Sequence, residues 1–253
     1  MSDPADVRKI ARQNLELEAL LGIREIPFSQ SEVAACSSAK AARSAGARTS
    51  SPDNAEQAAE LRTIDEQQVR DCRKCGLAAT RTNTVFGQGA SNARLVFVGE
   101  APGFEEDRQG LAFVGRAGQL LTRMIDAMTL TRDEVFICNV LKCRPPNNRD
   151  PAPDEVSACS PYLMEQLRII QPEVIIALGA PAARTLLQTN DSIGRLRGRF
   201  HEFKLEGPFS NNPPIPLMPT YHPAYLLRSP QQKAKTWADL QEVMERLGLK
   251  REK

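Results

Sequence analysis

The hydrophobic positions of the chain gather into four short, mostly apolar runs beyond residue 90. These runs are rich in β-branched residues and cover residues 93–99, 134–141, 173–179 and 214–221. Strands that are buried on both faces of a parallel sheet lack the polar alternation of half-exposed strands and read as such runs. We therefore expect four buried strands.

Segments with helical periodicity separate these runs. Apolar side chains recur every three or four residues in 115–130, 154–171 and 180–189, and again in 229–249 after the last run. Residues 195–205 ("RLRGRFHEFKL") are typical of a β-hairpin inside the last crossover. The alternation of strands and helices predicts an α/β fold with three layers, α/β/α, around a central, mostly parallel four-stranded sheet.

The first sixty residues do not follow this pattern. Residues 1–28 hold an amphipathic segment at 5–21, which we interpret either as a docking helix for a partner protein or, equally, as a helix packed on its own domain or loosely tethered to it. Residues 29–60 are rich in Ala and Ser and nearly free of large apolar side chains. Such a segment buries too little surface to offset chain entropy, so a disordered linker is expected, followed by a folded domain at 61–253.

Composition favours a globular protein of the cytoplasm. Hydrophobic residues make up 41% and charged residues 25% of the chain, and the net charge of +2 permits a nucleic-acid partner without requiring one. No run of about 18 apolar residues occurs, and the first residues lack the apolar core of a signal peptide. We expect a monomer that is neither secreted nor bound to a membrane.

Four of the six cysteines have the spacing of a metal site. Cys72 and Cys75 form a C-x-x-C motif, and Cys143 and Cys159 follow in a loop and in a predicted helix. Disulfides are rare in reducing compartments, and four thiolates can hold either a tetrahedral zinc ion or a [4Fe-4S] cluster. Spacing alone does not choose between these two, and a redox-active C-x-x-C beside two buried cysteines is a further alternative.

Polar and aromatic side chains that could bind a ligand follow the ends of the predicted strands, which is where α/β sheets bind ligands. The loop that begins at Gly99 ("GEAPGFEED") lacks the lysine of a phosphate-binding loop, and its carboxylates would repel phosphate. A neutral ring packed against Phe113 fits better, although Phe113 in the core is an equal alternative. Asn139 lies in an apolar run beside Cys138, a candidate core residue. A buried amide pairs either with backbone or with a ligand that offers one donor and one acceptor.

His222 follows the last predicted strand. Pro223 restricts His222 to an extended conformation, which keeps its ring at the carboxyl edge of the sheet. Leu226 and Leu227, which we expect to be exposed, come next and precede Arg228. This combination in one loop favours a functional role over a structural one.

Residues 61–247 resemble the family 4 uracil-DNA glycosylases, the iron-sulfur branch of that superfamily. The resemblance rests on the four-cysteine spacing and on "GEAPGFEED", "FVGRAG", "NVLKCRPPNNR" and "HPAYLLR". It implies an enzyme that flips deoxyuridine out of single- or double-stranded DNA and hydrolyses its N-glycosidic bond to begin base excision repair. Residues 5–21 would then meet a repair or replication partner. The alternative is a non-catalytic iron-sulfur module that binds DNA or senses redox state.

The resemblance also implies roles for the residues of the pocket. Phe113 would stack on the flipped base, Asn139 would bond its O4 and N3–H, and His222 would donate to its O2. Glu100 is the candidate for orienting the attacking water, and Glu105 would stand where other branches use a tyrosine to exclude the methyl group of thymine. The backbone of three consecutive residues would line the pocket: Gly99, Glu100 and Ala101.

Two further sets of residues receive roles from the resemblance. A [4Fe-4S] cluster would be held by Cys72, Cys75, Cys143 and Cys159. In the DNA, Leu226 and Leu227 would fill the space left by the flipped nucleotide, and Arg228 would contact phosphate.

Overall fold

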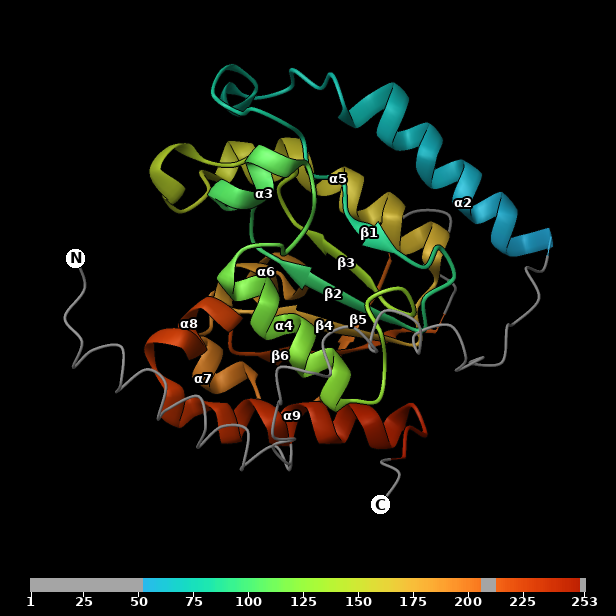
Figure 1. Ribbon diagram of the computed structural model, residues 1–253, viewed down its shortest axis with the longest axis vertical. Helices are drawn as coiled ribbons and strands as arrows, with labels where there is room; N and C mark the ends of the chain where they lie inside the picture. The colour runs from blue at the N-terminus through green and yellow to red at the C-terminus, as the bar shows by residue number, and fades with distance from the viewer. Residues whose placement is uncertain (1–51, 206–212, 251–253) are drawn as a thin grey trace, which may run out of the picture. The chain divides into compact units, whose positions relative to one another are not determined.

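The computed structural model describes residues 52–205 and 213–250 (Figure 1). The expected amphipathic helix at 5–21 and the linker residues 29–51 lie outside these ranges. The strands are β1 Gln88–Gly89, β2 Leu95–Gly99, β3 Phe136–Asn139, β4 Val174–Leu178, β5 His201–Phe203 and β6 Ile215–Thr220. The α-helices are α2 Pro52–Ile64, α3 Phe104–Gln109, α4 Arg116–Ala127, α5 Pro153–Ile170, α6 Ala180–Leu187, α7 Ile193–Leu196, α8 Pro223–Arg228 and α9 Lys233–Arg246. Short 3-10 or π-helical turns occupy Asp65–Val69, Gly76–Ala79, Pro146–Asn148 and Pro230–Gln232.

The sheet has a parallel centre and two antiparallel edges. Its strand order is β1-β3-β2-β4-β6-β5, and the four central strands run parallel to one another. They are the four strands that the apolar runs predict. β1 and β5 add antiparallel edges that are two and three residues long, so the sheet has six strands where four were expected.

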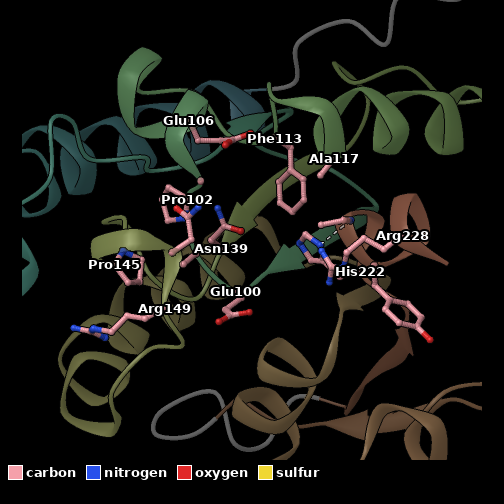
Figure 2. A pocket seen from close by; sticks show the side chains of 15 residues that line it. Glu100, Pro102, Glu106, Phe113, Ala117, Asn139, Pro145, Arg149, His222 and Arg228 are labelled. Atoms are coloured by element: carbon pink, nitrogen blue, oxygen red, sulfur yellow. Dashed lines mark hydrogen bonds between the residues drawn. The ribbon is translucent and has the colours of Figure 1, made fainter. Parts of the chain in front are cut away.

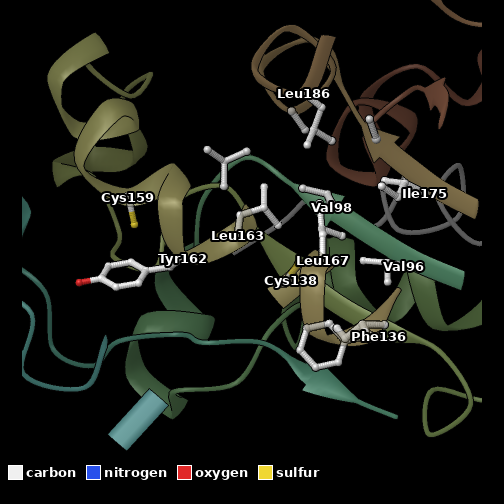
Figure 3. Close-up of a cluster of buried hydrophobic side chains, with 14 of the residues drawn as sticks. Val96, Val98, Phe136, Cys138, Cys159, Tyr162, Leu163, Leu167, Ile175 and Leu186 are labelled. Atoms are coloured by element: carbon white, nitrogen blue, oxygen red, sulfur yellow. The ribbon is translucent and has the colours of Figure 1, made fainter. Parts of the chain in front are cut away.

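Helices cover both faces of the sheet. Alternate strand residues point to opposite faces, and Val96 and Val98 of β2 belong to a buried cluster with Leu163 and Leu167 of α5 (Figure 3). Cys138 is fully buried in this cluster, as the sequence predicts. Figure 1 shows α4 and α9 on the other side of the sheet. The three-layer α/β/α architecture expected from the sequence is confirmed.

The stretch 195–205 is not a β-hairpin. Its beginning belongs to α7, and only His201–Phe203 form a strand, which pairs with β6. Between them the Arg197 guanidinium donates to the carboxylate of Asp239 in α9. This tertiary contact, which no local pattern reveals, determines the course of the chain here.

Helix α2 corrects the expected boundary of the folded domain. Residues 52–60 are helical, although the linker was expected to extend through residue 60. The helix has few large apolar side chains, but Leu61 and Ile64 are buried, and Gln57 Nε2 donates to the Ile169 carbonyl over 2.8 Å. Packing against α5 therefore holds a helix that its own composition does not indicate.

No helix within residues 52–205 and 213–250 combines the length and apolar character that a membrane crossing requires.

Candidate functional site

A cavity of about 420 Å³ lies at the carboxyl edge of the parallel strands (Figure 2). Residues after β2, β3 and β6 meet around it, as expected for an open α/β sheet. Its walls are formed by Glu100, Ala101, Pro102, Gly103, Glu106, Phe113, Ala117, Asn139, Pro145, Asn148, Arg149, His222, Ala224, Tyr225 and Arg228. The structure thus unites most of the pocket residues that the sequence indicates.

Asn139 presents a buried amide without a protein partner for its oxygen. The residue ends β3 and is 1% exposed, and its Oδ1 has no hydrogen-bond donor among the described residues. An unpaired buried acceptor costs about 1–3 kcal/mol, so such an atom marks a place where a ligand donor can bind. The functional interpretation of this amide is therefore favoured over the structural one.

Gly99 makes room for this amide. It pairs in register with Asn139, and a Cβ at position 99 would collide with Asn139 Oδ1 and stand 2.6 Å from Phe113 Cζ. Any other residue at position 99 would push the amide or the ring into the cavity. Gly99 stays paired in the sheet, and it contributes to the site by the space that its missing side chain leaves.

Phe113 forms a wall of the cavity. It is 6% exposed, and its backbone adopts a left-handed conformation (φ 53°), which is uncommon for a residue with a bulky side chain. The Glu106 carboxylate supports this turn by accepting hydrogen bonds from the backbone N–H groups of Val114 and Gly115 at 2.9 and 2.8 Å. The ring centroid lies 5.6 Å from that of His222. Phe113 is thus buried and faces the cavity as well.

The predicted place of Glu105 in the pocket is wrong. Its carboxylate accepts from Arg108 at 2.6 Å on the surface of α3, and the adjacent Glu106 lines the cavity instead. The sequence presents consecutive acidic residues here, and only the rotation of the helix decides which one faces inward.

His222 is held as a neutral hydrogen-bond donor. Burial, and secondarily the positive charge of Arg228, lowers its pKa to about 4. Its Nδ1 accepts from the Ala224 backbone N–H at 3.1 Å, which leaves the proton of the neutral ring on Nε2. The residue caps α8 with extended backbone, the conformation that Pro223 favours.

Glu100 brings a carboxylate to the same cavity. Burial raises its pKa, and the nearby Asp150 adds to the effect. Its backbone carbonyl accepts from the Leu141 N–H at 3.0 Å, which fixes the turn after β2 against the chain that leaves β3. A carboxylate with a raised pKa is a better proton acceptor than an ordinary one.

The two leucines of α8 do not share one role. Leu226 is 1% exposed and packs inside the protein, so the expectation that it is exposed for insertion into DNA is wrong. Leu227 is 40% exposed, and Arg228 lines the cavity beside it. Consecutive side chains of an α-helix point in different directions, so Leu226 and Leu227 cannot both face the same surroundings.

The four cysteines of the predicted metal site line a second, small cavity. Three protein donors reach their sulfurs: Arg81 Nη1 to Cys143 at 3.4 Å, the Lys142 backbone N–H to Cys159 at 3.2 Å and the Tyr162 hydroxyl to Cys72 at 3.3 Å. The complete wall is Val69, Cys72, Lys74, Cys75, Leu77, Arg81, Lys142, Cys143, Ala158, Cys159 and Tyr162.

This donor set fits thiolate ligands. Burial raises the pKa of the Cys143 thiol to about 11, so a metal must displace its proton on binding. Within the described part of the chain, no group of three or more His, Cys, Asp or Glu side chains is arranged as a finished metal site. The structure therefore shows a shared cavity and its donors, without a formed ligand geometry.

Comparison with known proteins agrees with this geometry. Residues 86–241 match the uracil DNA glycosylase superfamily. The type-4 uracil-DNA glycosylase of Archaeoglobus fulgidus is 43% identical over 196 residues, which cover 75% of this chain and 96% of the relative. That of Thermotoga maritima is 46% identical over 171 residues, 67% of this chain and 85% of the relative. The chain belongs to the type-4 uracil-DNA glycosylases. The family resemblance inferred from the sequence motifs is confirmed.

Several residues of this type-4 glycosylase pocket were not predicted from the sequence, among them Glu106, Asn148 and Tyr225. Glu106 supports the Phe113 turn, while Asn148 and Tyr225 add polar groups to the wall. The "PPNNR" stretch signals a loop that follows the strand of Asn139, but not its return to the cavity.

Proposed function

We propose that this protein removes uracil from single- and double-stranded DNA by hydrolysing the bond between the base and deoxyribose, the first step of base excision repair. The observation that carries the proposal is the unpaired, buried amide of Asn139 in one cavity with the Phe113 ring and a neutral His222. Family membership supports the same reaction, since the curated relatives are named type-4 uracil-DNA glycosylases.

Asn139 reads the base. Uracil offers the O4 acceptor next to the N3–H donor, and the amide supplies the complementary pair, with Oδ1 accepting from N3–H. Cytosine presents an acceptor at N3 and a donor at its amino group, so it would leave the buried amide mismatched. A site built to bond a donor rejects an analogue that lacks it by about 10⁴-fold. Phe113 stacks on the ring of the flipped base, and Ala101 lines the same cavity.

His222 stabilises the leaving group. When the N-glycosidic bond breaks, its electron pair stays with uracil and the sugar becomes oxocarbenium-like. The Nε2–H of His222 donates to O2 of the resulting anion, and one such donor contributes about 3–4 kcal/mol in other enzymes. Because the ring is neutral before the reaction, no imidazolium charge has to be desolvated in the closed pocket.

Glu100 orients the water that completes hydrolysis. The water adds to the sugar carbon and loses a proton to the carboxylate, which returns it to solvent, while the departing uracil anion takes up a proton from solvent, so that the products are free uracil and an abasic sugar. Two carboxylates line the cavity, and Glu106 is engaged by the backbone N–H groups of Val114 and Gly115, so we assign this step to Glu100, whose pKa burial raises.

Leu227 and Arg228 engage the DNA. Extruding a nucleotide costs a few kcal/mol of stacking and pairing, and least at a mismatch. The exposed Leu227 side chain fills the gap in the stack, and the Arg228 guanidinium contacts phosphate.

A [4Fe-4S] cluster would be held by Cys72, Cys75, Cys143 and Cys159, which line one cavity. When bound, the cluster supplies iron-thiolate bonds that join the segment before β1 to the loop after β3 and to α5. No chemical step is assigned to it. The donors from Arg81, Lys142 and Tyr162 stabilise the thiolate charge.

The test is uracil release from single-stranded and U:G duplex DNA without added cofactor. We expect release by the wild type and strong loss in Asn139→Ala and in His222→Ala, with DNA binding retained. A folded wild type that leaves both substrates intact would refute the proposal and favour a non-catalytic DNA-binding module.

A further inference from the structure

Lys142 is a lysine buried between the base pocket and the cavity of the cysteines. It is 1% exposed, and the described residues contain no salt bridge to its ammonium group. Buried lysines are rare unless their charge is paired, so this position needs an explanation.

Two neutral oxygens hold the ammonium group in place. Lys142 Nζ donates to the backbone carbonyl of Asn139 at 2.8 Å and to Gln166 Oε1 at 2.6 Å. Gln166, which is fully buried in α5, in turn donates from Nε2 to the Phe86 carbonyl at 2.8 Å. The chain of bonds therefore runs from the backbone of the base-reading residue into the long helix α5.

The main chain of Lys142 contacts the other cavity. Its N–H donates to Cys159 Sγ at 3.2 Å, and the next residue is Cys143. Three residues thus separate Asn139, which reads the base, from Cys143 in the wall of the thiol cavity, and Lys142 bonds in both directions. Beyond Asn139 the Val140 and Leu141 N–H groups donate to the Gly99 and Glu100 carbonyls at 2.9 and 3.0 Å, while the Asn139 carbonyl itself is held by the Lys142 ammonium group.

We propose that Lys142 is a positioning residue that holds Asn139 in its uracil-reading place and anchors it to α5. The inference rests on the proposed reading of uracil by Asn139. The amide stands against the Gly99 backbone with no spare room, so a small shift of the Asn139 carbonyl moves Oδ1 off its ligand. Misplacing a binding group by about 1 Å can cost about 100-fold in rate.

The decisive experiment is a double-mutant cycle in the full-length protein. Lys142→Met keeps the stem and removes the three N–H donors. We expect a single-turnover rate of uracil release about 10- to 100-fold below wild type, and a similar loss in affinity for free uracil measured by calorimetry. In the Asn139→Ala background the same change should alter the rate less than about 2-fold, because Lys142 acts through Asn139.

Stability and metal content are measured on every variant. Thermal unfolding reports any structural contribution of Lys142, which should appear in both backgrounds. Visible absorption near about 400 nm reports an iron-sulfur cluster. Val243→Ala, at a fully buried position of α9, is the matched control for simple destabilisation and should keep the wild-type rate within about 2-fold.

A second variant covers failure of Lys142→Met to fold. Gln166→Met removes the acceptor on the far side of the ammonium group and should lower the rate about 3- to 10-fold, again only when Asn139 is present. Equal rate losses with and without Asn139, or a folded Lys142→Met enzyme with the wild-type rate, would overturn the inference while uracil release by the wild type stands. A wild type inactive on all uracil-containing DNA would instead overturn the proposed function and this inference with it.

Discussion

The neutral state of His222 predicts that uracil release is insensitive to this group well into the acid range. Burial disfavours the charged ring and, with the charge of Arg228, lowers its pKa to about 4. At about pH 5.5 roughly 3% of such rings are protonated, whereas an ordinary histidine with a pKa of about 6.5 would be roughly 90% protonated. The difference is about a tenfold change in the population of neutral ring.

The assay is the single-turnover rate of uracil release from a single-stranded oligonucleotide between about pH 8 and pH 5.5. Glu100 also faces the cavity, and its raised pKa gives the wild type an acid limb of its own. The profile is therefore recorded in Glu100→Gln as well, where we expect less than about a 2-fold change over this range. Glu106 and the guanidinium groups of Arg149 and Arg228 are the other charged groups of the wall.

Nuclear magnetic resonance gives a direct reading of the same group. The chain has two histidines, so His201→Gln leaves His222 as the single imidazole signal. We expect its ring to keep the neutral Nε2–H form at about pH 5.5. A tenfold fall in the rate of Glu100→Gln with an apparent pKa near 6.5, accompanied by titration of this signal, would refute the reasoning.

The lowered pKa of His222 also predicts that the folded protein loses stability as the pH falls. The unfolded chain binds a proton at His222 as the pH falls through about 6.5, while the folded protein does so only near its pKa of about 4. Stability is therefore complete above about pH 6.5 and declines toward pH 4, by about 3 kcal/mol in total from this group. Urea unfolding of the wild type and of His222→Phe should show a smaller acid loss in the variant.

Three further predictions follow from the geometry. Gly99→Ala should reduce uracil release at least about 100-fold and lower the melting temperature, because its Cβ displaces the Asn139 amide. Leu227→Ala should slow release from U:A duplexes more than from single strands and change stability by less than about 0.5 kcal/mol. The control Leu111→Ala, at a similarly exposed position that does not line the cavity, should leave both rates at the wild-type level and change stability equally little. Cys143→Ser should lose visible absorption near about 400 nm; a variant that keeps the wild-type spectrum would remove this cysteine from the ligand set.

Much of the pocket was accessible from the sequence because its residues lie at strand ends. Apolar runs indicate buried parallel strands, and the chemistry of such sheets gathers where the strands end. Asn139 and His222 could therefore be named as candidates from their positions, and the resemblance to the family 4 glycosylases joined Phe113 to them in one site. Pro223 contributed by fixing the backbone at the last of these positions.

Side-chain direction was less accessible. Leu226 and Leu227 are equally apolar, as Glu105 and Glu106 are equally acidic, and composition cannot separate such neighbours. Each helix packs one side against its domain, and this rotation buries Leu226 and turns Glu106 toward the cavity. The phase of a six-residue helix depends on contacts that are distant in sequence.

The sequence by itself determined the α/β architecture, the family and the strand ends that carry the pocket, because these follow from periodicity and from motifs a few residues long. Only the tertiary structure decided that Asn139 Oδ1 lacks a protein donor and that Lys142 bonds the carbonyl of the same residue. It also decided that the C-x-x-C motif meets Cys143 and Cys159 at one cavity. These facts depend on atoms brought together from separate segments, and burial gives such contacts their energetic weight because water cannot replace a missing partner there.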